Sequence, residues 1–154
     1  MLEVLIIYCM KLSSPEFNDG EEIPNKIGYM EENTNPELRI EDVPDEASSL
    51  VLIMDDPDAV EAAGKIWDHW IMYDIDTSIG EINSGDSPGK EGRTDFRETG
   101  YNGPNPPDGE HTYVFTLYAL DTELGLPKGA SKEEVEDAME GHVIEKSELK
   151  GRYE

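Results

Sequence analysis

The residue types that can do chemistry are concentrated in two stretches of the sequence. The first, DDPDAVEAAGKIWDHW at 55–70, begins with the three aspartates Asp55, Asp56 and Asp58 and ends with His69 between the chain's two tryptophans. The second, GYNGPNPPDGEH at 100–111, holds three glycines and three prolines and ends in a second histidine, His111. A neutral imidazole accepts a hydrogen bond and a charged one donates, so histidines beside carboxylates can bind an anion or transfer a proton.

Each stretch also has a structural explanation. A loop stiffened by prolines and turned by glycines can present backbone N–H groups to an anion, but most loops of this composition are purely structural. A lone histidine on an apolar strand, such as His69, is more often a core residue than a ligand-binding one. The third histidine, His142, follows the end of a predicted helix, where a structural role is favoured.

Two kinds of active site lack a recognisable signature. Asp56, Asp58, His69 and His111 have the side chains that bind zinc or a hard cation, but their spacing matches no known ligand motif. No serine or cysteine is obviously paired with a histidine, so the sequence supplies no evident nucleophile for a hydrolase. Acid–base chemistry stays open, so a small-ester or phosphate hydrolase that uses His69 or His111 is the alternative to a binding protein.

Four runs of apolar or alternating residues predict the strands that must hold these side chains. They are ELRIE (37–41), SLVLIMD (49–55), WDHWIMYDI (67–75) and HTYVFTLYALD (111–121). The second run is continuously apolar, as expected of a central strand covered on both faces, and the last two are rich in aromatic and β-branched residues. Alternation along 67–75 places Trp67 and His69 on one face and Trp70 on the other, facing the core.

One helix is predicted, late in the chain. Ser131 and Glu134 form a capping-box pattern at its start, and Gly141 is a natural stop. Short strands, long turn-rich connections and one late α-helix indicate a mostly β protein: a two-sheet antiparallel Greek-key β-sandwich in a single domain spanning 1–154. Residues 1–9 are expected to be an extra N-terminal strand or an extension, because they lack the basic start and cleavage site of a signal peptide.

The motifs together resemble a known family. DDPDA, the W-x-HW strand and GY-x-GP-x-PP-x-G-x-H-x-Y-x-F-x-LYALD are similar to motifs of the phosphatidylethanolamine-binding protein family, also called the Raf kinase inhibitor family. The opening MKLSSPEFNDGEEIP and the ending AMEGHVIEKSELKGRYE resemble the family's start and the tail of its bacterial and archaeal branch. The resemblance covers about residues 10–153.

The resemblance implies a small pocket at one end of the sandwich that binds phosphate, acetate or a phosphoryl headgroup. Its ligand-binding residues, carried over by position, are Asp56, Asp58, Trp67, His69, Gly103, Pro104, His111 and Tyr113. On this hypothesis His69, His111 and the backbone N–H near Gly103 donate to the anion. Asp56 orients a histidine or accepts from a protonated ligand oxygen, and the aromatic residues form walls.

Three positions depart from the family pattern. Val60 stands where proline usually follows DPDA, Asn105 replaces a cysteine found in many prokaryotic members, and Thr112 replaces an arginine. The missing arginine removes a cation from the expected pocket mouth, which should weaken anion binding.

The predicted function is therefore a non-enzymatic small-anion binding module that needs no cofactor, with regulation of a partner protein as a further hypothesis. We expect a cytoplasmic monomer or homodimer. The single cysteine, Cys9, excludes an internal disulfide, and no apolar run is long enough to span a membrane.

The charge of the chain is unusual. It carries 36 Asp and Glu against 12 Lys and Arg, a formal net charge of -24. A field of this sign repels nucleic acid and anionic membranes, so neither is expected as a partner. Because the acidic residues are spread along the whole chain, we predict adaptation to a salt-rich cytoplasm and a halophilic archaeal source; an acidic protein from an ordinary cytoplasm is the alternative.

The acidic clusters suggest a third function, weak binding of Ca²⁺-type cations. The candidates are Glu21-Glu22, Glu31-Glu32 and Asp55-Asp56-Asp58. A solvated acidic surface explains the same clusters without any bound cation.

The net charge predicts a salt-dependent fold. Raising KCl from about 0.1 M to about 1 M shortens the Debye length from about 10 Å to about 3 Å, so the melting temperature should rise by at least about 5 °C. Thermal melts followed by circular dichroism measure this. Adding Ca²⁺ at fixed high ionic strength is the control, because an unchanged melting temperature there would leave screening as the cause and remove the cation-binding hypothesis.

Overall fold

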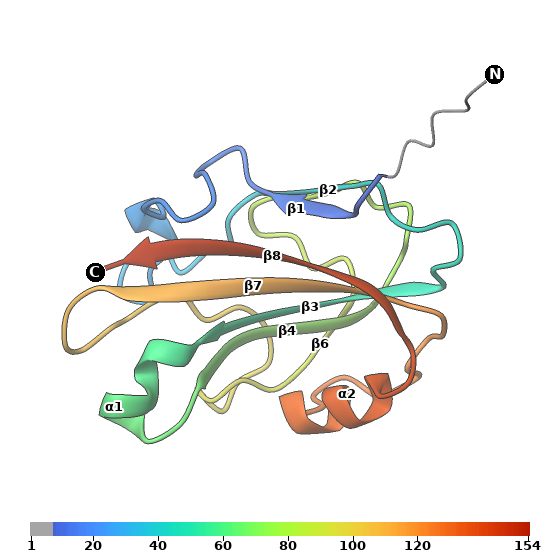
Figure 1. Cartoon of the computed structure of the whole chain (residues 1–154). Coiled ribbons are helices and arrows are strands. Elements are labelled where there is room, and N and C mark those ends of the chain that lie inside the picture. The colour runs from blue at the N-terminus through green and yellow to red at the C-terminus, as the bar shows by residue number, and fades with distance from the viewer. Residues whose placement is uncertain (1–7) are drawn as a thin grey trace.

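The structure is a computed structural model that describes residues 8–154, and it is built mostly from two antiparallel sheets (Figure 1). Most of the predicted N-terminal strand at 1–9 lies outside the described residues. Within the described part, Tyr8 and Cys9 belong to no strand.

The larger sheet has five strands in the order β6-β4-β3-β7-β8, and the smaller has three in the order β1-β2-β5. The strands are β1 (Lys11–Ser13), β2 (Leu38–Glu41), β3 (Ser49–Asp56), β4 (Trp67–Ile75), β5 (Glu81–Ile82), β6 (Lys90–Glu91), β7 (His111–Leu120) and β8 (Val143–Tyr153). The α-helices are α1 (Val60–Ala63) and α2 (Lys132–Met139), with short 3₁₀ turns at Asn25–Ile27 and Pro57–Ala59. The Greek-key description of the connections stays a prediction.

All four strands predicted from apolar patterning are present, as β2, β3, β4 and β7. The capping box is also present, since Ser131 and Glu134 exchange side-chain and backbone hydrogen bonds at the start of α2. The longest strand, β8, is absent from the sequence analysis. It is an edge strand in which only Leu149 and Gly151 are buried, so it carries no apolar pattern even though it pairs with β7 along its length.

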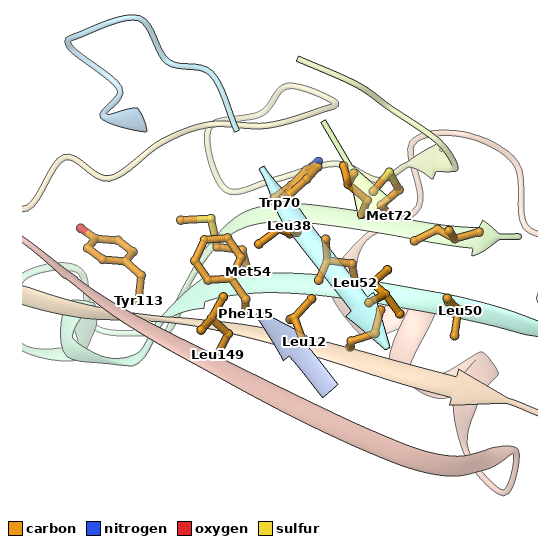
Figure 2. Packing of buried hydrophobic residues seen from close by; sticks show 14 of the residues in the cluster. Leu12, Leu38, Leu50, Leu52, Met54, Trp70, Met72, Tyr113, Phe115 and Leu149 are labelled. Atoms are coloured by element: carbon orange, nitrogen blue, oxygen red, sulfur yellow. The ribbon is translucent and has the colours of Figure 1, made fainter. Parts of the chain in front are cut away.

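The main core lies between the two sheets (Figure 2). Leu12 and Leu38 of the smaller sheet share it with Leu52 and Phe115 of the larger one. A second cluster lies on the opposite face of the larger sheet, where α2 contributes Val135. The other members of this second cluster are Val51, Ile53, Ile71, Tyr73, Leu120, Ala130 and Met139. The larger sheet is therefore covered on both faces, which explains the continuous apolar run of β3.

The register between β3 and β4 shifts at two points, and one of them lies at the end of the strands that holds His69. Met54 of β3 pairs with Trp70, whereas the next residue of β3, Asp55, pairs with Asp68. His69 is left without an opposing residue, which is the geometry of a β-bulge.

The bulge corrects the prediction that Trp70 faces away from Trp67 and His69. Trp70 is buried as expected, but it lies in the core cluster that also holds Tyr113, and the ring of His69 contacts that same tyrosine. Simple alternation fails here because a bulge adds one residue to the count and so shifts the faces.

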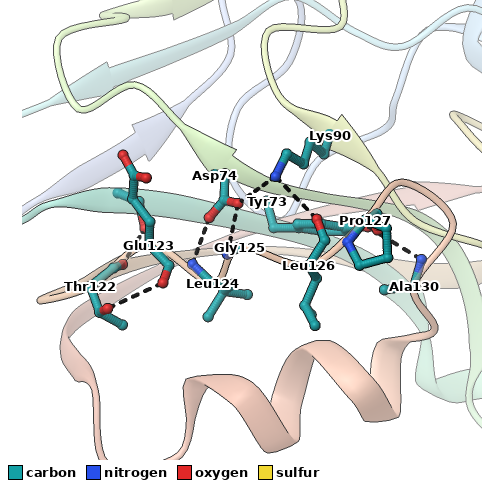
Figure 3. Close-up of polar contacts among 11 residues, drawn as sticks. Tyr73, Asp74, Lys90, Thr122, Glu123, Leu124, Gly125, Leu126, Pro127 and Ala130 are labelled. Atoms are coloured by element: carbon teal, nitrogen blue, oxygen red, sulfur yellow. Dashed lines mark hydrogen bonds and ion pairs between the residues drawn. The ribbon is translucent and has the colours of Figure 1, made fainter.

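A polar latch holds the segment between β7 and α2 against the edge of the larger sheet (Figure 3). The carboxylate of Asp74 accepts from the backbone N–H of Leu124 at 2.7 Å and of Gly125 at 3.1 Å. Lys90 Nζ lies 3.1 Å from the same carboxylate and donates to the carbonyl of Leu126 at 3.1 Å. The latch fixes the segment that leads into α2.

Replacing Asp74 by Asn should destabilise the fold by about 2 kcal/mol, because two backbone donors and one ammonium lose a charged acceptor. Asp74 has a φ of 52°, which asparagine tolerates, so the backbone is not strained by the change. Urea unfolding measures the loss. The matched control is Asp86→Asn, which removes the same charge at an exposed position; equal stability of the two variants would contradict the latch.

Candidate functional site

The candidate site lies at the end of the larger sheet where β3 finishes and where β4 and β7 begin. Antiparallel pairing sets Asp56, the last residue of β3, opposite Trp67, the first of β4. On the other side Asp55 pairs with Val114, so His111 and Tyr113 of β7 reach the same end. The backbone register thus assembles two segments that are far apart in the sequence.

A pocket of about 250 Å³ occupies this end. Its lining residues are Asp56, Ala59, Ala62, Ala63, Trp67, His69, Phe96, Asn105, Pro107, His111 and Tyr113. Five of the eight predicted ligand-binding residues are among them: Asp56, Trp67, His69, His111 and Tyr113. The alanines come from the short helical segment after Asp56, which forms one wall.

Asp58 does not line the pocket but supports it. Its backbone N–H donates to Asp56 Oδ1 at 3.0 Å, and its own carboxylate accepts from the N–H of Thr112 at 2.8 Å. The residue therefore ties the end of β3 to the start of β7, and the predicted role in ligand contact is replaced by a structural one.

Gly103 and Pro104 also lie outside the lining. The N–H of Gly103 itself donates to Asn33 Oδ1 at 2.7 Å, so donation to a ligand from a backbone N–H near Gly103 stays a prediction. A Cβ at Gly103 would clash with the carbonyl oxygen of Ile27, which explains the glycine by close backbone approach. The carbonyl of Pro104 accepts from the N–H of Tyr29 at 2.9 Å.

His111 lies between two carboxylates. Its Nδ1 is 2.6 Å from Asp56 Oδ2 and its Nε2 is 2.5 Å from Asp108 Oδ1. Burial alone would lower the pKa of His111, but the hydrogen bonds to Asp56 and Asp108 outweigh it and raise that pKa. His111 is therefore a charged donor whose two N–H groups are both occupied.

His69 is the opposite case. Its Nδ1 donates to the carbonyl of Asn102 at 2.8 Å, and burial lowers its pKa more than this bond and the charge of Asp56 raise it. The ring is therefore neutral at neutral pH with its proton on Nδ1, which leaves Nε2 as an acceptor. Donation from His69 to an anion, as the family resemblance implies, requires the charged ring and stays a prediction.

Aromatic rings form the remaining walls. Phe96 packs edge-on against His69 and Trp67, with ring centroids 5.2 Å and 6.0 Å apart, and it stacks on Tyr29 at 4.8 Å. Burial raises the pKa of Tyr113 far above its usual value, and the charge of Asp56 acts in the same direction, so the phenol stays neutral.

The sequence analysis missed Phe96, Asn102 and Asp108. Asn102 is buried; its side-chain amide donates to Thr94 Oγ1 at 3.1 Å, which ties the turn that carries Phe96 to His69. Asp108 could have been predicted from the sequence, because a carboxylate three residues before His111 is close enough to reach its ring. Nothing in the sequence around Phe96 indicates a place in the pocket beyond its aromatic character.

The three departures from the family pattern have different positions. Asn105 lines the pocket, and Thr112 uses its backbone to bind Asp58. Val60 is 49% exposed at the start of α1 and does not line the pocket, so its replacement of proline leaves the walls unchanged.

The aspartates of the 55–58 stretch do not converge on a common point. Asp55 pairs with Lys132 of α2 at 2.8 Å, on the far face of the sheet from Asp56. Across residues 8–154, no three His, Cys, Asp or Glu side chains form a group that could hold a metal ion.

A groove of mixed charge adjoins the pocket and shares Trp67 with it. Its charged lining residues are Lys65, Asp68, Arg93, Asp95, Arg97, Lys132 and Glu133. Lys65 pairs with Asp95 at 2.7 Å and Lys132 with Asp68 at 3.3 Å, so both lysines are balanced by neighbouring carboxylates.

Residues 13–154 match the family described as phosphatidylethanolamine-binding protein. A relative from Methanothermobacter thermautotrophicus, named UPF0098 protein, is 45% identical over 94% of this chain and 98% of its own length. A putative homologue from Chlamydia trachomatis has a crystal structure that superposes with a TM-score of 0.91 at 39% identity, covering 95% of this chain and 97% of that one. Escherichia coli YbcL, described as a member of the mammalian family, gives 0.86 at 25% identity over 94% and 98% of the two chains.

The chain therefore belongs to the phosphatidylethanolamine-binding protein family, and the resemblance carried by its motifs is confirmed at that level. Its mostly β fold with two antiparallel sheets matches the related crystal structures. In the described part of the chain, no helix has both the length and the apolar character needed to cross a bilayer.

The pKa of His111 should lie above the ordinary histidine value of 6.5, and the pKa of His69 should lie below it. Imidazole ¹⁵N spectra recorded against pH should show His111 losing its proton at the higher pH and His69 at the lower, with neutral His69 protonated on Nδ1. The reverse order would contradict the assignment.

The same shifts fix the sign of the pH-dependent stability. The contribution of His111, whose folded pKa is raised, is complete below about pH 6.5 and is lost as pH rises through the raised value. The contribution of His69, whose folded pKa is lowered, is present above about pH 6.5 and is lost as pH falls through the lowered value.

Proposed function

We propose that the pocket binds a small phosphoryl anion, such as phosphate or the phosphoryl end of a headgroup. The observation that carries the proposal is the pairing of one neutral and one charged imidazole on the same small cavity. A singly protonated phosphoryl group has both kinds of partner: its P–OH donates to Nε2 of His69, and a P–O⁻ oxygen accepts from Nε2 of His111. Near neutral pH the singly protonated form is in equilibrium with the dianion, since the second pKa of a phosphoryl group is about 6, and an acceptor at Nε2 of His69 selects the protonated form.

The apolar walls of the pocket suit a ligand whose part beyond the phosphoryl group is apolar or small. Trp67, Phe96 and the alanines that follow Asp56 surround the polar end, in the manner of small-molecule sites with few polar groups. The family name points to the same chemistry, a phosphoryl headgroup.

The charge of the protein opposes anion entry, and the fixed ring of His111 offsets it. The ion pair with the buried carboxylate of Asp56, at 2.6 Å from Nδ1, fixes the ring and supports its positive charge, which leaves Nε2–H as the donor for a ligand. At high salt the long-range repulsion is screened, whereas this short contact persists.

The proposal is for a binding protein and not an enzyme. No serine, cysteine, threonine or lysine is among the residues 8–154 that line the pocket, so no side-chain nucleophile of these types lies beside His69 or His111. Turnover of chromogenic esters or phosphate esters that disappears in His111→Ala would contradict this and favour the hydrolase.

Other parts of the sequence interpretation stay predictions: regulation of a partner protein, a monomeric or homodimeric state, a cytoplasmic location, weak Ca²⁺-type binding and adaptation to high salt in a halophilic archaeon.

Filling the pocket should abolish binding of inorganic phosphate. Ala63→Phe places a ring in the cavity from an exposed helical turn, so the fold should survive, and the affinity should fall at least about tenfold. Isothermal titration at pH 7 measures it. Val60→Phe is the matched control, because Val60 lies on the same short helix and is exposed but does not line the pocket.

His69→Gln tests the polar end of the same site. Glutamine keeps an amide acceptor, so the second variant is His69→Leu, which removes the acceptor at Nε2 and should weaken phosphate binding, whereas His69→Gln should retain part of the affinity. Wild-type affinity in both Ala63→Phe and His69→Leu would show that phosphate binds elsewhere and would end the proposal.

A further inference from the structure

The two carboxylates on His111 are not equivalent. Asp56 is buried, and its second oxygen is fixed by the N–H of Asp58. Asp108 has a side chain that is 44% exposed, and its carboxylate contacts His111 Nε2. One carboxylate is part of the framework, whereas the other is held at the pocket mainly by the imidazole.

The Asp108 carboxylate occupies the position that a ligand oxyanion needs. His111 lines the pocket and has two N–H groups, of which Nδ1–H points to the buried Asp56. Only Nε2–H can serve a ligand, and an oxygen of Asp108 already lies 2.5 Å from that nitrogen. An anion can accept from His111 only after this carboxylate has moved away.

The loop around Asp108 is suited to such a movement. Residues 107–110 are exposed, and Gly109 has a φ of 118° with open space where a side chain would be. Glycine in this region can change conformation at little steric cost. The contact that must break is a half-exposed charge-assisted hydrogen bond, which is weaker than a buried one because water screens it.

We infer that Asp108 is a built-in competitor of the ligand: its carboxylate stands in for the oxyanion on His111 and must be displaced when a phosphoryl group binds. The inference rests on the proposed phosphate function and adds the residue that sets its affinity. Tethering gives Asp108 an effective concentration on the order of millimolar or more, so free anions must bind well to displace it. In the ligand-free protein the same contact neutralises His111 and keeps the pocket mouth closed to weak anions.

The test is titration of inorganic phosphate and of acetate into Asp108→Asn and a matched control. Glu110→Gln removes the same charge from the same loop, but Glu110 pairs with Arg152 at 3.2 Å and not with His111. Competition predicts that Asp108→Asn binds both anions about tenfold more tightly than the wild type, by similar factors, while Glu110→Gln changes either affinity less than about twofold.

The possible outcomes separate the inference from the function beneath it. If phosphate binds the wild type and Ala63→Phe abolishes binding, but Asp108→Asn has unchanged or weaker affinity, the pocket stands and the competitor is refuted. Equal gains in Asp108→Asn and Glu110→Gln would also refute it, because they would show general charge repulsion. If neither the wild type nor Asp108→Asn binds phosphate, the proposed function fails and the inference fails with it.

A spectroscopic measurement on Asp108 checks its displacement directly. The side-chain carboxyl ¹³C resonance of Asp108 should shift on addition of phosphate in the wild type and lose that response in Ala63→Phe. A resonance that is unmoved at saturating phosphate would overturn displacement.

Discussion

The site depends on one extra residue in β4. Because His69 has no opposing residue in β3, Trp67, His69 and Trp70 all reach the side of the sheet that holds Tyr113, where strict alternation would place only two of them. The bulge residue also anchors the neighbouring loop twice. Its carbonyl accepts from the N–H of Asn102 at 2.9 Å, and its ring donates to the carbonyl of Asn102 at 2.8 Å. The loop that carries Asn105, Pro107 and Asp108 therefore begins from a fixed point on the pocket floor.

The sequence predicted the elements better than the contacts between them. The strands β3, β4 and β7 could be recognised because their composition is apolar and β-branched, and the cap of α2 because its residues are local. The charged edge strand β8 could not be recognised, since its stability comes from pairing with β7 and not from its own apolar face. A bulge is equally invisible, because it is defined by the partner strand.

The sequence indicated which residues line the pocket better than it indicated what each of them does there. Nothing in the sequence distinguishes His69 from His111, yet burial beside a carbonyl makes one an acceptor and two carboxylates make the other a donor. Gly103 was correctly marked as special, and it serves a close approach to Ile27. These distinctions require tertiary distances, which motifs do not contain.

The bulge also has a consequence for changes in chain length. Since Asp68 already opposes Asp55 and Trp70 already opposes Met54, deleting His69 would leave a regular ladder in which each neighbour keeps its present face. His69 is thus one inserted residue at this point of β4, and the pairing of β3 with β4 here does not depend on it. Deleting this one residue would separate the effect on core packing from the effect on the pocket. The core contributed by β4 would be retained, while the pocket would lose both its acceptor and the residue that anchors its loop.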